Sequence, residues 1–551
     1  MATHILPPPN TLGAPDRYDV WRENQSQAVA QILASPKRFV GVCAPTGSGK
    51  SLIAWITAKL HNQRALFISS TKELQSQYMD RERGFGGHGL VNIMGQNNYE
   101  CIAADYFGLS NGSQRIMVDA GPCHFGAPCP YKKNGCLYFD MAIPAAKRSD
   151  AICTNYSYRI SNSRSREDFA RVTSEGATPE TIGVMIADEA HNAFNSMTSF
   201  LSTCLKGRDF DLLEASPLST NNFHQWTEWA AEHNVTLEQR ITALKAEIAS
   251  DPKQSHLHAE ATALRDLSGK LTTLATAKGE WIVERDGGTI QFDPVWPGVY
   301  AESLLWRSVP HNILMSATLT RKTMQLLGIA PDDFDFFEFP STFPIERRRV
   351  YHLKSGFIKY NTSDVDLRLW MMGIDNLIRT RSLELGWKTI IHSVSYERMK
   401  YIKEHSQYGM FMTTHTSRTA RETVARFRSA PSPAILVSPA ITEGIDLPDD
   451  MCRLNILAKM PFPNPTSAIM KARAAQDAEY MGYIMVNSAT QATGRSTRSE
   501  LDWSESFICD DSVWSYIGSR HRPGKYRHLF SQWWLDGYMG TVDTVPPPCK
   551  F

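Results

Sequence analysis

The chain has 551 residues, enough for two to four domains and a substantial core. Hydrophobic residues make up 42% and charged residues 21%, the balance of a globular protein, and no apolar run reaches the roughly 20 residues of a membrane span. The formal net charge of +1 excludes a histone-like polycation but leaves room for a local basic groove that binds nucleic acid.

The N-terminal stretch, residues 1–19, has no basic region followed by an apolar one, so we expect no signal peptide. In a chain that is not exported the cysteines stay reduced, and a disulfide framework is not expected. Six of the ten cysteines are scattered along the chain. The other four lie within 36 residues: Cys101, Cys123, Cys129 and Cys136.

Residues 38–60 predict a strand, a glycine-rich loop and a helix, with the strand at Phe39–Cys43. In the loop "APTGSGKS" (44–51) the glycines let backbone N–H groups turn toward phosphate oxygens, and the next helix adds its positive end. Lys50 is expected to reach the β- and γ-phosphates and Ser51 to bind Mg²⁺. A chance glycine-rich turn is the alternative. The expected nucleotide-binding residues of this loop are Thr46, Gly47, Ser48, Gly49, Lys50 and Ser51.

A second strand, at Ile182–Ala187, ends in the acidic sequence "DEAH". Asp188 is placed to hold Mg²⁺ through water, and Glu189 to polarise the attacking water as a general base. His191 follows where it could couple the nucleotide to other motifs. An acidic strand end is common by itself, but its pairing with the 44–51 loop favours a nucleotide-hydrolysing site.

With these two motifs the chain resembles the superfamily 2 DNA helicases of the XPD/DinG type. The motifs of that family have matches in the same order along most of the chain. Residues 21–32 resemble the Q-motif region, which implies contact with adenine through Arg22 and Gln25. Residues 65–80 resemble motif Ia, a strand and helix start that grips the DNA backbone.

Further motifs follow in the second half of the chain. Residues 313–320 resemble motif III, and residues 340–352 resemble the segment that opens the second motor domain. Residues 388–402, 434–450 and 491–502 resemble motifs IV, V and VI. The resemblance implies roles at the DNA or the nucleotide for Ser393, Ser395, Thr442, Glu443, Gly444, Asp446 and Gln491.

Motif VI contains two arginines, Arg495 and Arg498, that are three residues apart and would face the same way on a helix. Two guanidinium groups from the second domain could clamp a γ-phosphate held by the first and stabilise transition-state charge. A solvated arginine pair is the alternative. We therefore expect Lys50, Asp188, Glu189, Arg495 and Arg498 to be the catalytic residues.

The four clustered cysteines have the spacing C-x21-C-x5-C-x6-C. Four thiolates suit an iron–sulfur cluster or zinc. Zinc sites usually have two short C-x2–4-C knuckles, which are absent here. The XPD/DinG family carries a 4Fe–4S cluster at this point of the chain, so the resemblance implies a 4Fe–4S cluster on Cys101, Cys123, Cys129 and Cys136, with zinc as the alternative.

A second insertion follows the DEAH sequence. Leucine and isoleucine recur at helical spacing over 234–250 and 256–277, which predicts two helices in an antiparallel hairpin, and residues 280–297 predict a β-hairpin turned by "DGG". The resemblance implies a small version of the family's arch domain, although plain helical packing is equally compatible.

The residues alone predict two α/β units with parallel sheets. The resemblance makes the fold α/β with two RecA-like parallel-sheet motor domains, a small Fe–S insertion domain and a short helical arch insertion. The expected domains are motor domain 1 over 1–94, 151–194 and 301–340, the iron–sulfur domain over 95–150, the arch over 195–300 and motor domain 2 over 341–551.

The resemblance implies an ATP-dependent DNA helicase that uses ATP and Mg²⁺, moves 5′→3′ on single-stranded or forked DNA and serves DNA repair. Two alternatives are an ATPase that remodels RNA or RNA–DNA hybrids, and a nucleotide-binding scaffold without unwinding activity. We expect a monomer with no membrane partner. The expected compartment is the cytoplasm of a bacterium or a virus-infected cell, or the nucleus if the source is eukaryotic.

Overall fold

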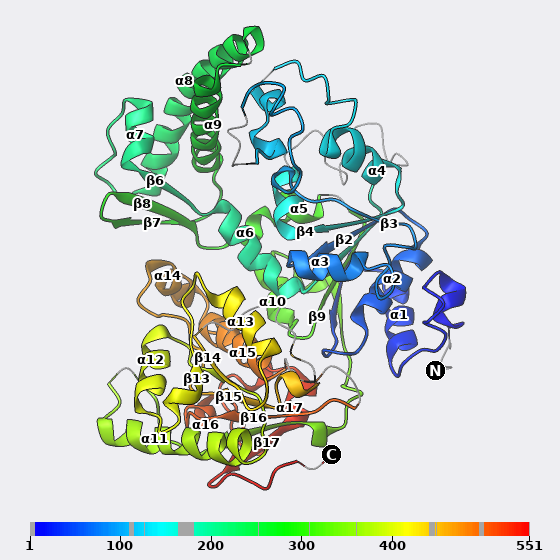
Figure 1. Cartoon of the computed structure of the whole chain (residues 1–551), viewed down its shortest axis with the longest axis vertical. Coiled ribbons are helices and arrows are strands. Elements are labelled where there is room, and N and C mark those ends of the chain that lie inside the picture. The colour runs from blue at the N-terminus through cyan, green and yellow to red at the C-terminus, as the bar shows by residue number, and fades with distance from the viewer. Residues whose placement is uncertain are drawn as a thin grey trace.

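The computed structural model describes residues 6–109, 115–125, 127–163, 181–251, 253–307, 309–359, 361–439, 447, 449–494, 497, 501–549 and 551. Two seven-stranded sheets dominate it, one in the upper and one in the lower half of Figure 1. Every pairing within these two sheets is parallel, as the sequence predicts for both motor domains. None of the helices in the described ranges has the length and apolar character needed to cross a membrane.

The first sheet has the strand order β10-β1-β9-β5-β2-β4-β3. Its central strands are continuous apolar runs that are buried along their whole length, the pattern of a sheet covered by helices on both faces. The strands are β1 (Phe39–Cys43), β2 (Ala65–Ser69), β3 (Leu90–Asn92), β4 (Ala151–Asn155), β5 (Val184–Asp188), β9 (His311–Ser316) and β10 (Phe334–Glu338). The helices around it are α1 (Gln25–Ala34), α2 (Lys50–His61), α3 (Lys72–Met79), α4 (Ile143–Arg148), α5 (Tyr156–Asn162), α6 (Ala193–Leu201) and α10 (Arg321–Leu326).

The second sheet has the strand order β13-β14-β12-β15-β16-β11-β17. Its strands are β11 (Arg348–Leu353), β12 (Thr389–His392), β13 (Met412–Thr413), β14 (Ile435–Ser438), β15 (Leu454–Leu457), β16 (Ser504–Ile508) and β17 (Tyr538–Val542). The helices that accompany it are α11 (Asp364–Leu377), α12 (Tyr396–His405), α13 (Ala420–Ser429), α14 (Ala468–Gln476), α15 (Tyr480–Thr493), α16 (Val513–Tyr516) and α17 (Gln532–Gly537).

A third, antiparallel sheet lies in the insertion after the DEAH sequence. Its strands are β6 (Thr203–Lys206), β7 (Trp281–Asp286) and β8 (Thr289–Pro294), and its helices are α7 (Gly207–Leu213), α8 (Phe223–Ser250) and α9 (Ser255–Ala275). The predicted β-hairpin is confirmed as β7 and β8, and the predicted helix pair as α8 and α9, whose leucine stripes are buried. Figure 1 shows this helix pair projecting away from both parallel sheets.

Residues 95–150, the cysteine segment, contain short turns, a π-helix at Leu137–Ala142 and α4. The segment connects β3 to β4 of the first sheet. It contacts the helix pair, because α8 and α9 both touch the short helix Pro122–Phe125. The two insertions therefore lie against each other on the same side of the first sheet.

Candidate nucleotide site between the two sheets

Strand order places the nucleotide motifs at one edge of the first sheet. Strands β10, β9 and β5 lie next to or near β1, with Cys43 beside Ser316 and Asp188 beside Met315 in the register. The loop after β1, the acids at the end of β5 and the segment after β9 therefore lie at the same edge of the sheet. In parallel sheets such a carboxyl edge is where ligands bind.

The glycine-rich loop has the conformation that its sequence predicts. Gly47 and Gly49 have φ angles of 76° and 77°, a left-handed conformation that glycine adopts without strain. Helix α2 begins at Lys50, so its N-terminus faces the loop's cavity. The Lys50 Nζ donates to the carbonyl oxygens of Ala44, at 3.3 Å, and Pro45, at 3.2 Å.

Arg22 and Gln25 both contact this loop. The Arg22 Nη1 donates to the Gly47 carbonyl at 3.1 Å, and the Gln25 Nε2 donates to the Ser48 carbonyl at 2.9 Å. The Gln25 Oε1 accepts from the backbone N–H of Arg22, and a Cβ at Gly49 would lie only 2.2 Å from Gln25 Nε2. Arg22 lines the cavity, whereas buried Gln25 braces the loop. Their contact with adenine stays a prediction.

The two acids differ in their surroundings. The Asp188 Oδ1 accepts from the backbone N–H of Glu189 at 2.9 Å, and its Oδ2 accepts from the Tyr78 hydroxyl at 3.0 Å. Glu189 has a φ of 47°, a left-handed conformation that costs a non-glycine residue on the order of 1–3 kcal/mol. This local strain turns the Glu189 side chain toward Ser316 and His191.

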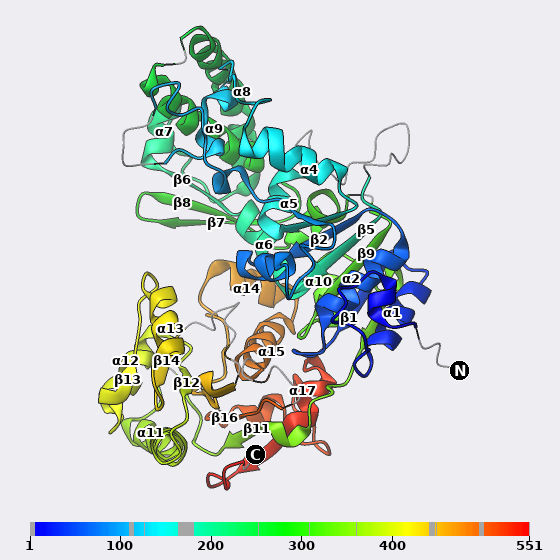
Figure 2. The ribbon, with the colours of Figure 1, turned by 45° about the vertical axis from the view of Figure 1, so that its right-hand side comes forward.

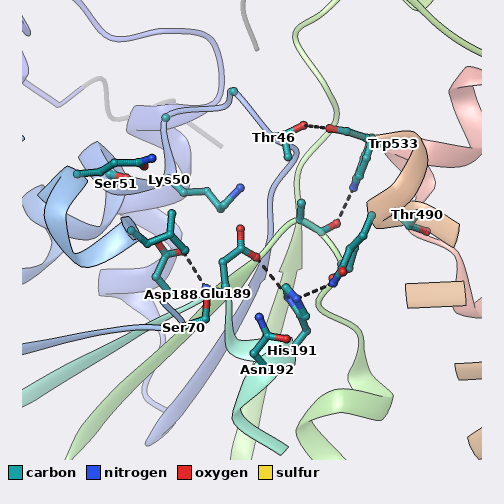
Figure 3. Close-up of a pocket in the computed structure, with 18 of the residues that line it drawn as sticks. Thr46, Lys50, Ser51, Ser70, Asp188, Glu189, His191, Asn192, Thr490 and Trp533 are labelled. Carbon is teal, nitrogen blue, oxygen red and sulfur yellow. Dashed lines mark hydrogen bonds and ion pairs between the residues drawn. The ribbon is translucent and has the colours of Figure 1, made fainter. Parts of the chain in front are cut away.

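A line of side chains crosses from the acids to the second sheet (Figure 3). The Ser316 Oγ donates to the Glu189 Oε2 at 3.1 Å and lies 2.6 Å from the His191 Nδ1. On the other side of its ring, the His191 Nε2 lies 2.6 Å from the Gln491 Nε2, on α15. Glu189, which is expected to act on water, is thus connected to a side chain of the second motor domain.

Both domains line the cavity, which has a volume of about 390 Å³, within the range of cofactor sites. The Thr46 hydroxyl donates to the Gly494 carbonyl at 3.3 Å, and the Trp533 Nε1 donates to the Ala317 carbonyl at 2.9 Å. In Figure 3 the Lys50 side chain points into the space beside Asp188 and Glu189. The cavity also exposes Ser51, Asn192 and Thr490.

Burial and neighbouring charges shift the pKa values of the two acids in opposite directions. Burial, together with the charge of Glu189, raises the pKa of Asp188 above its usual range. Burial also raises the pKa of Glu189, but the hydrogen bond and charge of His191, the Lys50 charge and the Ser316 hydroxyl outweigh it and hold that pKa well below its usual range. Glu189 is therefore ionised at neutral pH and can accept a hydrogen bond from water.

Several expected site residues lie outside the described residues: Thr442, Glu443, Gly444, Asp446, Arg495 and Arg498. Their roles stay predictions. The structure brings together Thr46, Gly47, Gly49, Lys50, Ser51, Asp188, Glu189, Arg22 and Gln491 around the cavity, with Ser48 and Gln25 behind the loop.

The site also contains residues that the sequence did not single out, among them Tyr78, Asn192, Ser316, Thr490 and Trp533. Asn192 and Thr490 stand beside His191 and Gln491, so their position next to motif residues was an available signal. Trp533 lies far from motif VI in the sequence, and only the packing of α17 brings it to Ala317.

The four cysteines gather within the cysteine segment. Burial raises the pKa of Cys101, and the charges of Cys129 and Cys136 add to the rise; burial raises the pKa of Cys123 to about 11, and its three neighbours again contribute. A Cβ at Gly121 would lie 3.1 Å from the Cys101 Sγ, so the glycine leaves room beside that thiol. Among the described residues, no three His, Cys, Asp or Glu side chains converge closely enough to hold one metal ion.

Two known families match parts of the chain that contribute residues to the cavity. Residues 22–110 match the DEAD/DEAH box helicase family, and residues 386–536 match the helicase C-terminal domain family. A probable ATP-dependent helicase of Methanocaldococcus jannaschii is 23% identical over 275 residues, a match that covers 45% of this chain. The matched segment spans 41% of that relative's length.

Two solved structures share the fold over nearly the whole chain. A structure described as an XPD helicase has a TM-score of 0.61 at 15% identity, with 94% of this chain and 99% of that chain covered. The Xpd4 structure of S. tokodaii has a TM-score of 0.57 at 13% identity, with 95% of this chain and 100% of that chain covered.

Two separate parts of the chain, residues 22–110 and 386–536, thus match helicase families, and both contribute residues to the cavity. The fold of nearly the whole chain is similar to that of the XPD structures.

Proposed function

We propose that this chain is an ATP-dependent DNA helicase that hydrolyses ATP, moves 5′→3′ on single-stranded DNA and unwinds forked duplexes as a monomer. The observation that carries the proposal is the connection from Glu189 through Ser316 and His191 to Gln491. It links the water-activating acid in one motor domain to a helix of the other. Such a link is what a motor needs if hydrolysis is to move its two domains.

The side chains divide the chemistry of hydrolysis among themselves. Lys50 would neutralise the β- and γ-phosphates, and the loop's N–H groups and the α2 N-terminus would hold phosphate oxygens. Ionised Glu189 would orient the attacking water. The Ser51 hydroxyl and the Asp188 carboxylate are hard oxygen donors that fit Mg²⁺, which would neutralise developing phosphate charge. Arg495 and Arg498 are proposed to reach the γ-phosphate from motor domain 2, with Glu443 and Asp446 nearby.

The nucleotide assignment is tested with Lys50→Ala. We expect the variant to lose at least about a hundredfold in ATPase rate, because transition-state charge on the phosphates would be left without its cation. Turnover close to that of the unsubstituted protein would contradict the site. Lys59→Ala, near the end of α2, is a matched control with a lysine removed from the same helix.

Substrate and direction are tested separately. Strand displacement is measured on duplexes with a 5′ or a 3′ single-stranded tail, and ATPase stimulation is compared between single-stranded DNA and RNA. The proposal requires displacement from the 5′ tail and stimulation by DNA. Stimulation by RNA alone would favour an RNA-remodelling ATPase, and hydrolysis without displacement on any substrate would favour a scaffold.

We also propose that Cys101, Cys123, Cys129 and Cys136 hold a 4Fe–4S cluster. Four soft thiolates fit its chemistry, and a cubane spreads its ligands around a larger core than one ion has. The charges of Cys101, Cys129 and Cys136 all raise the pKa of Cys123, so the four thiols lie near one another. The cluster would cross-link the cysteine segment, whose described residues form few helices.

Iron, sulfide and zinc are measured after anaerobic purification, for the unsubstituted chain and for Cys129→Ser. The expected result is about four irons and four sulfides per chain, with the visible absorption lost in the variant. Zinc at one per chain without sulfide would refute the cluster. Cys204→Ser, outside the segment, is the control.

The helix pair α8–α9 is proposed as the arch of this helicase. Its support is direct contact with the cysteine segment: the Arg265 Nη1 donates to the Asp119 carbonyl at 3.2 Å, and the guanidinium lies 5.2 Å from the centre of the Phe125 ring. The two insertions are thus held together, as they must be if they frame a passage for one DNA strand.

A further inference from the structure

Tyr78, on α3, lies within the stretch that resembles motif Ia and contacts the nucleotide site through Asp188. Its hydroxyl donates to the Asp188 Oδ2 at 3.0 Å, while the Asp188 Oδ1 accepts from the Glu189 N–H. Each oxygen of this carboxylate therefore has a donor in the protein. The Asp188 side chain is held in one orientation before any ligand arrives.

The Tyr78 ring is fixed as firmly as the carboxylate that it contacts. The residue is 4% exposed, and the centre of its ring lies 5.8 Å from that of Phe67 and 6.2 Å from that of Phe85. The hydroxyl of this packed ring is therefore held where it donates to the Asp188 carboxylate.

The same phenol also lies near helix α2, which follows the glycine-rich loop. The Ser51 side chain, in the first turn of α2, lies beside the Tyr78 hydroxyl. Ser51 and Asp188 are the two side chains that the proposed function assigns to Mg²⁺; Ser51 follows β1, and Asp188 is the last residue of β5. Tyr78 lies beside both and donates a hydrogen bond to Asp188.

Helix α3 holds Tyr78 from the other side. The Gln75 Nε2 donates to the Ile93 carbonyl at 3.0 Å, and the Asn155 Nδ2 donates to the Gln75 Oε1 at 3.0 Å. The side chain of Gln75 thereby ties α3 to the ends of β3 and β4. The position of the phenol is set by the fold and does not depend on the nucleotide.

We propose that Tyr78 is a positioning residue that pre-orients Asp188, beside Ser51, for Mg²⁺. The inference rests on the proposed function, since it assumes that these two side chains hold the metal. Groups that hydrogen-bond to metal ligands lower the cost of ordering those ligands, and their removal typically weakens metal affinity about 10- to 100-fold. The phenol has the geometry for that role.

The test is Tyr78→Phe, which removes one hydroxyl and keeps the packed ring. We expect the Mg²⁺ concentration for half-maximal ATPase activity to rise about tenfold or more, with kcat at saturating Mg²⁺ changed by less than about threefold. A fluorescent ADP analogue, titrated with Mg²⁺ in the absence of hydrolysis, should show the same shift in half-saturation.

Tyr156→Phe is the matched control. The Tyr156 hydroxyl donates to the backbone carbonyl of Asp188 at 3.1 Å and is as deeply buried, but it does not touch the carboxylate. Its loss should leave both Mg²⁺ half-saturation values unchanged. Thermal unfolding of the two variants reports the structural cost of each lost hydroxyl.

An unchanged Mg²⁺ dependence in Tyr78→Phe, or an equal shift in both variants, would overturn the proposal. Failure of the proposed function has a different signature, because there the unsubstituted chain would show no ATPase activity or Lys50→Ala would retain it. The two results cannot be confused.

Discussion

At the scale of single residues, His191 connects side chains of the two parallel-sheet domains. One of its ring nitrogens faces Ser316 and Glu189, and the other faces Gln491 of the second motor domain. The ring is largely shielded from solvent, so both contacts are made in a protein environment. A rotation of α15 that displaces Gln491 would therefore break a contact of the same ring that lies against Glu189.

Gln491→Ala should separate hydrolysis from unwinding. The substitution leaves Lys50, Asp188 and Glu189 in place, so we expect basal ATPase activity within about fivefold of the unsubstituted protein. The number of base pairs opened per ATP should fall at least about tenfold. The loss of one hydrogen bond to a buried partner costs about 1.4 kcal/mol, which corresponds to a factor of ten. Both rates are measured on the same tailed duplex.

Ser488→Ala, one turn earlier on α15, controls for removal of a polar group from the same helix. It should change neither rate. Equal losses of ATPase and displacement in Gln491→Ala would contradict a coupling role and would place Gln491 in hydrolysis alone.

At the scale of elements, a buried ion pair ties three parts of motor domain 2 together. The Arg381 Nε lies 2.7 Å from the Glu505 Oε2, and the two side chains are 2% and 0% exposed. Arg381 also donates to the Pro546 carbonyl, and Glu505 accepts from the Cys549 N–H. The π-helix Ile378–Leu383, strand β16 and the C-terminal segment meet at this pair.

Arg381→Met should destabilise motor domain 2 by about 3–5 kcal/mol, because it leaves the Glu505 charge buried without its partner. Scanning calorimetry, which separates the transitions of the two motor domains, is the measurement. Arg379→Ala is the control in the same π-helix: its pair with Glu384 is about half exposed on both sides, so a change of about 0–1 kcal/mol is expected. A similar small change in Arg381→Met would contradict the importance of the pair.

Elements defined by local patterns could be predicted from the sequence, and those defined by distant contacts could not. The leucine stripes of α8 and α9 and the "DGG" turn repeat or close within a few residues, so their signal is local. Strand β6 is a half-buried four-residue segment whose partner, β8, lies more than 80 residues later. The sequence around β6 contains no local pattern that predicts this pairing.

The site follows the same rule. Lys50, Ser51, Asp188 and Glu189 lie in short motifs, and the few residues of each motif are enough to predict its chemistry. Tyr78 reaches Asp188 across 110 residues, and Trp533 reaches Ala317 across 216, so both contacts depend on how whole helices pack. Sequence motifs therefore predicted the groups that are proposed to act on the nucleotide, and the structure added side chains that lie around them.

At the scale of the whole molecule, α14 connects motor domain 2 to the insertion. Figure 2 shows α14 directly beneath β7. Its Arg473, which is 3% exposed, donates to the Val295 carbonyl at 2.8 Å and to the Pro294 carbonyl at 3.1 Å. The guanidinium also lies 5.0 Å from the centre of the Phe194 ring, on α6 just after the DEAH sequence. Motor domain 1, motor domain 2 and the insertion thus share one buried cation.

Arg473→Met should therefore slow unwinding more than hydrolysis. Methionine keeps much of the volume but leaves two carbonyl oxygens without this donor, and α14 would lose its buried contact with the end of β8. We expect displacement of a forked duplex to fall at least about tenfold while single-stranded DNA still stimulates the ATPase to within about threefold of the unsubstituted level. Lys471→Ala, on the exposed face of α14, should change neither. Displacement that fell only in proportion to ATPase activity would contradict this role of α14. Movement of the motor domains would then act on the duplex only through the bound DNA strand, and not through the insertion.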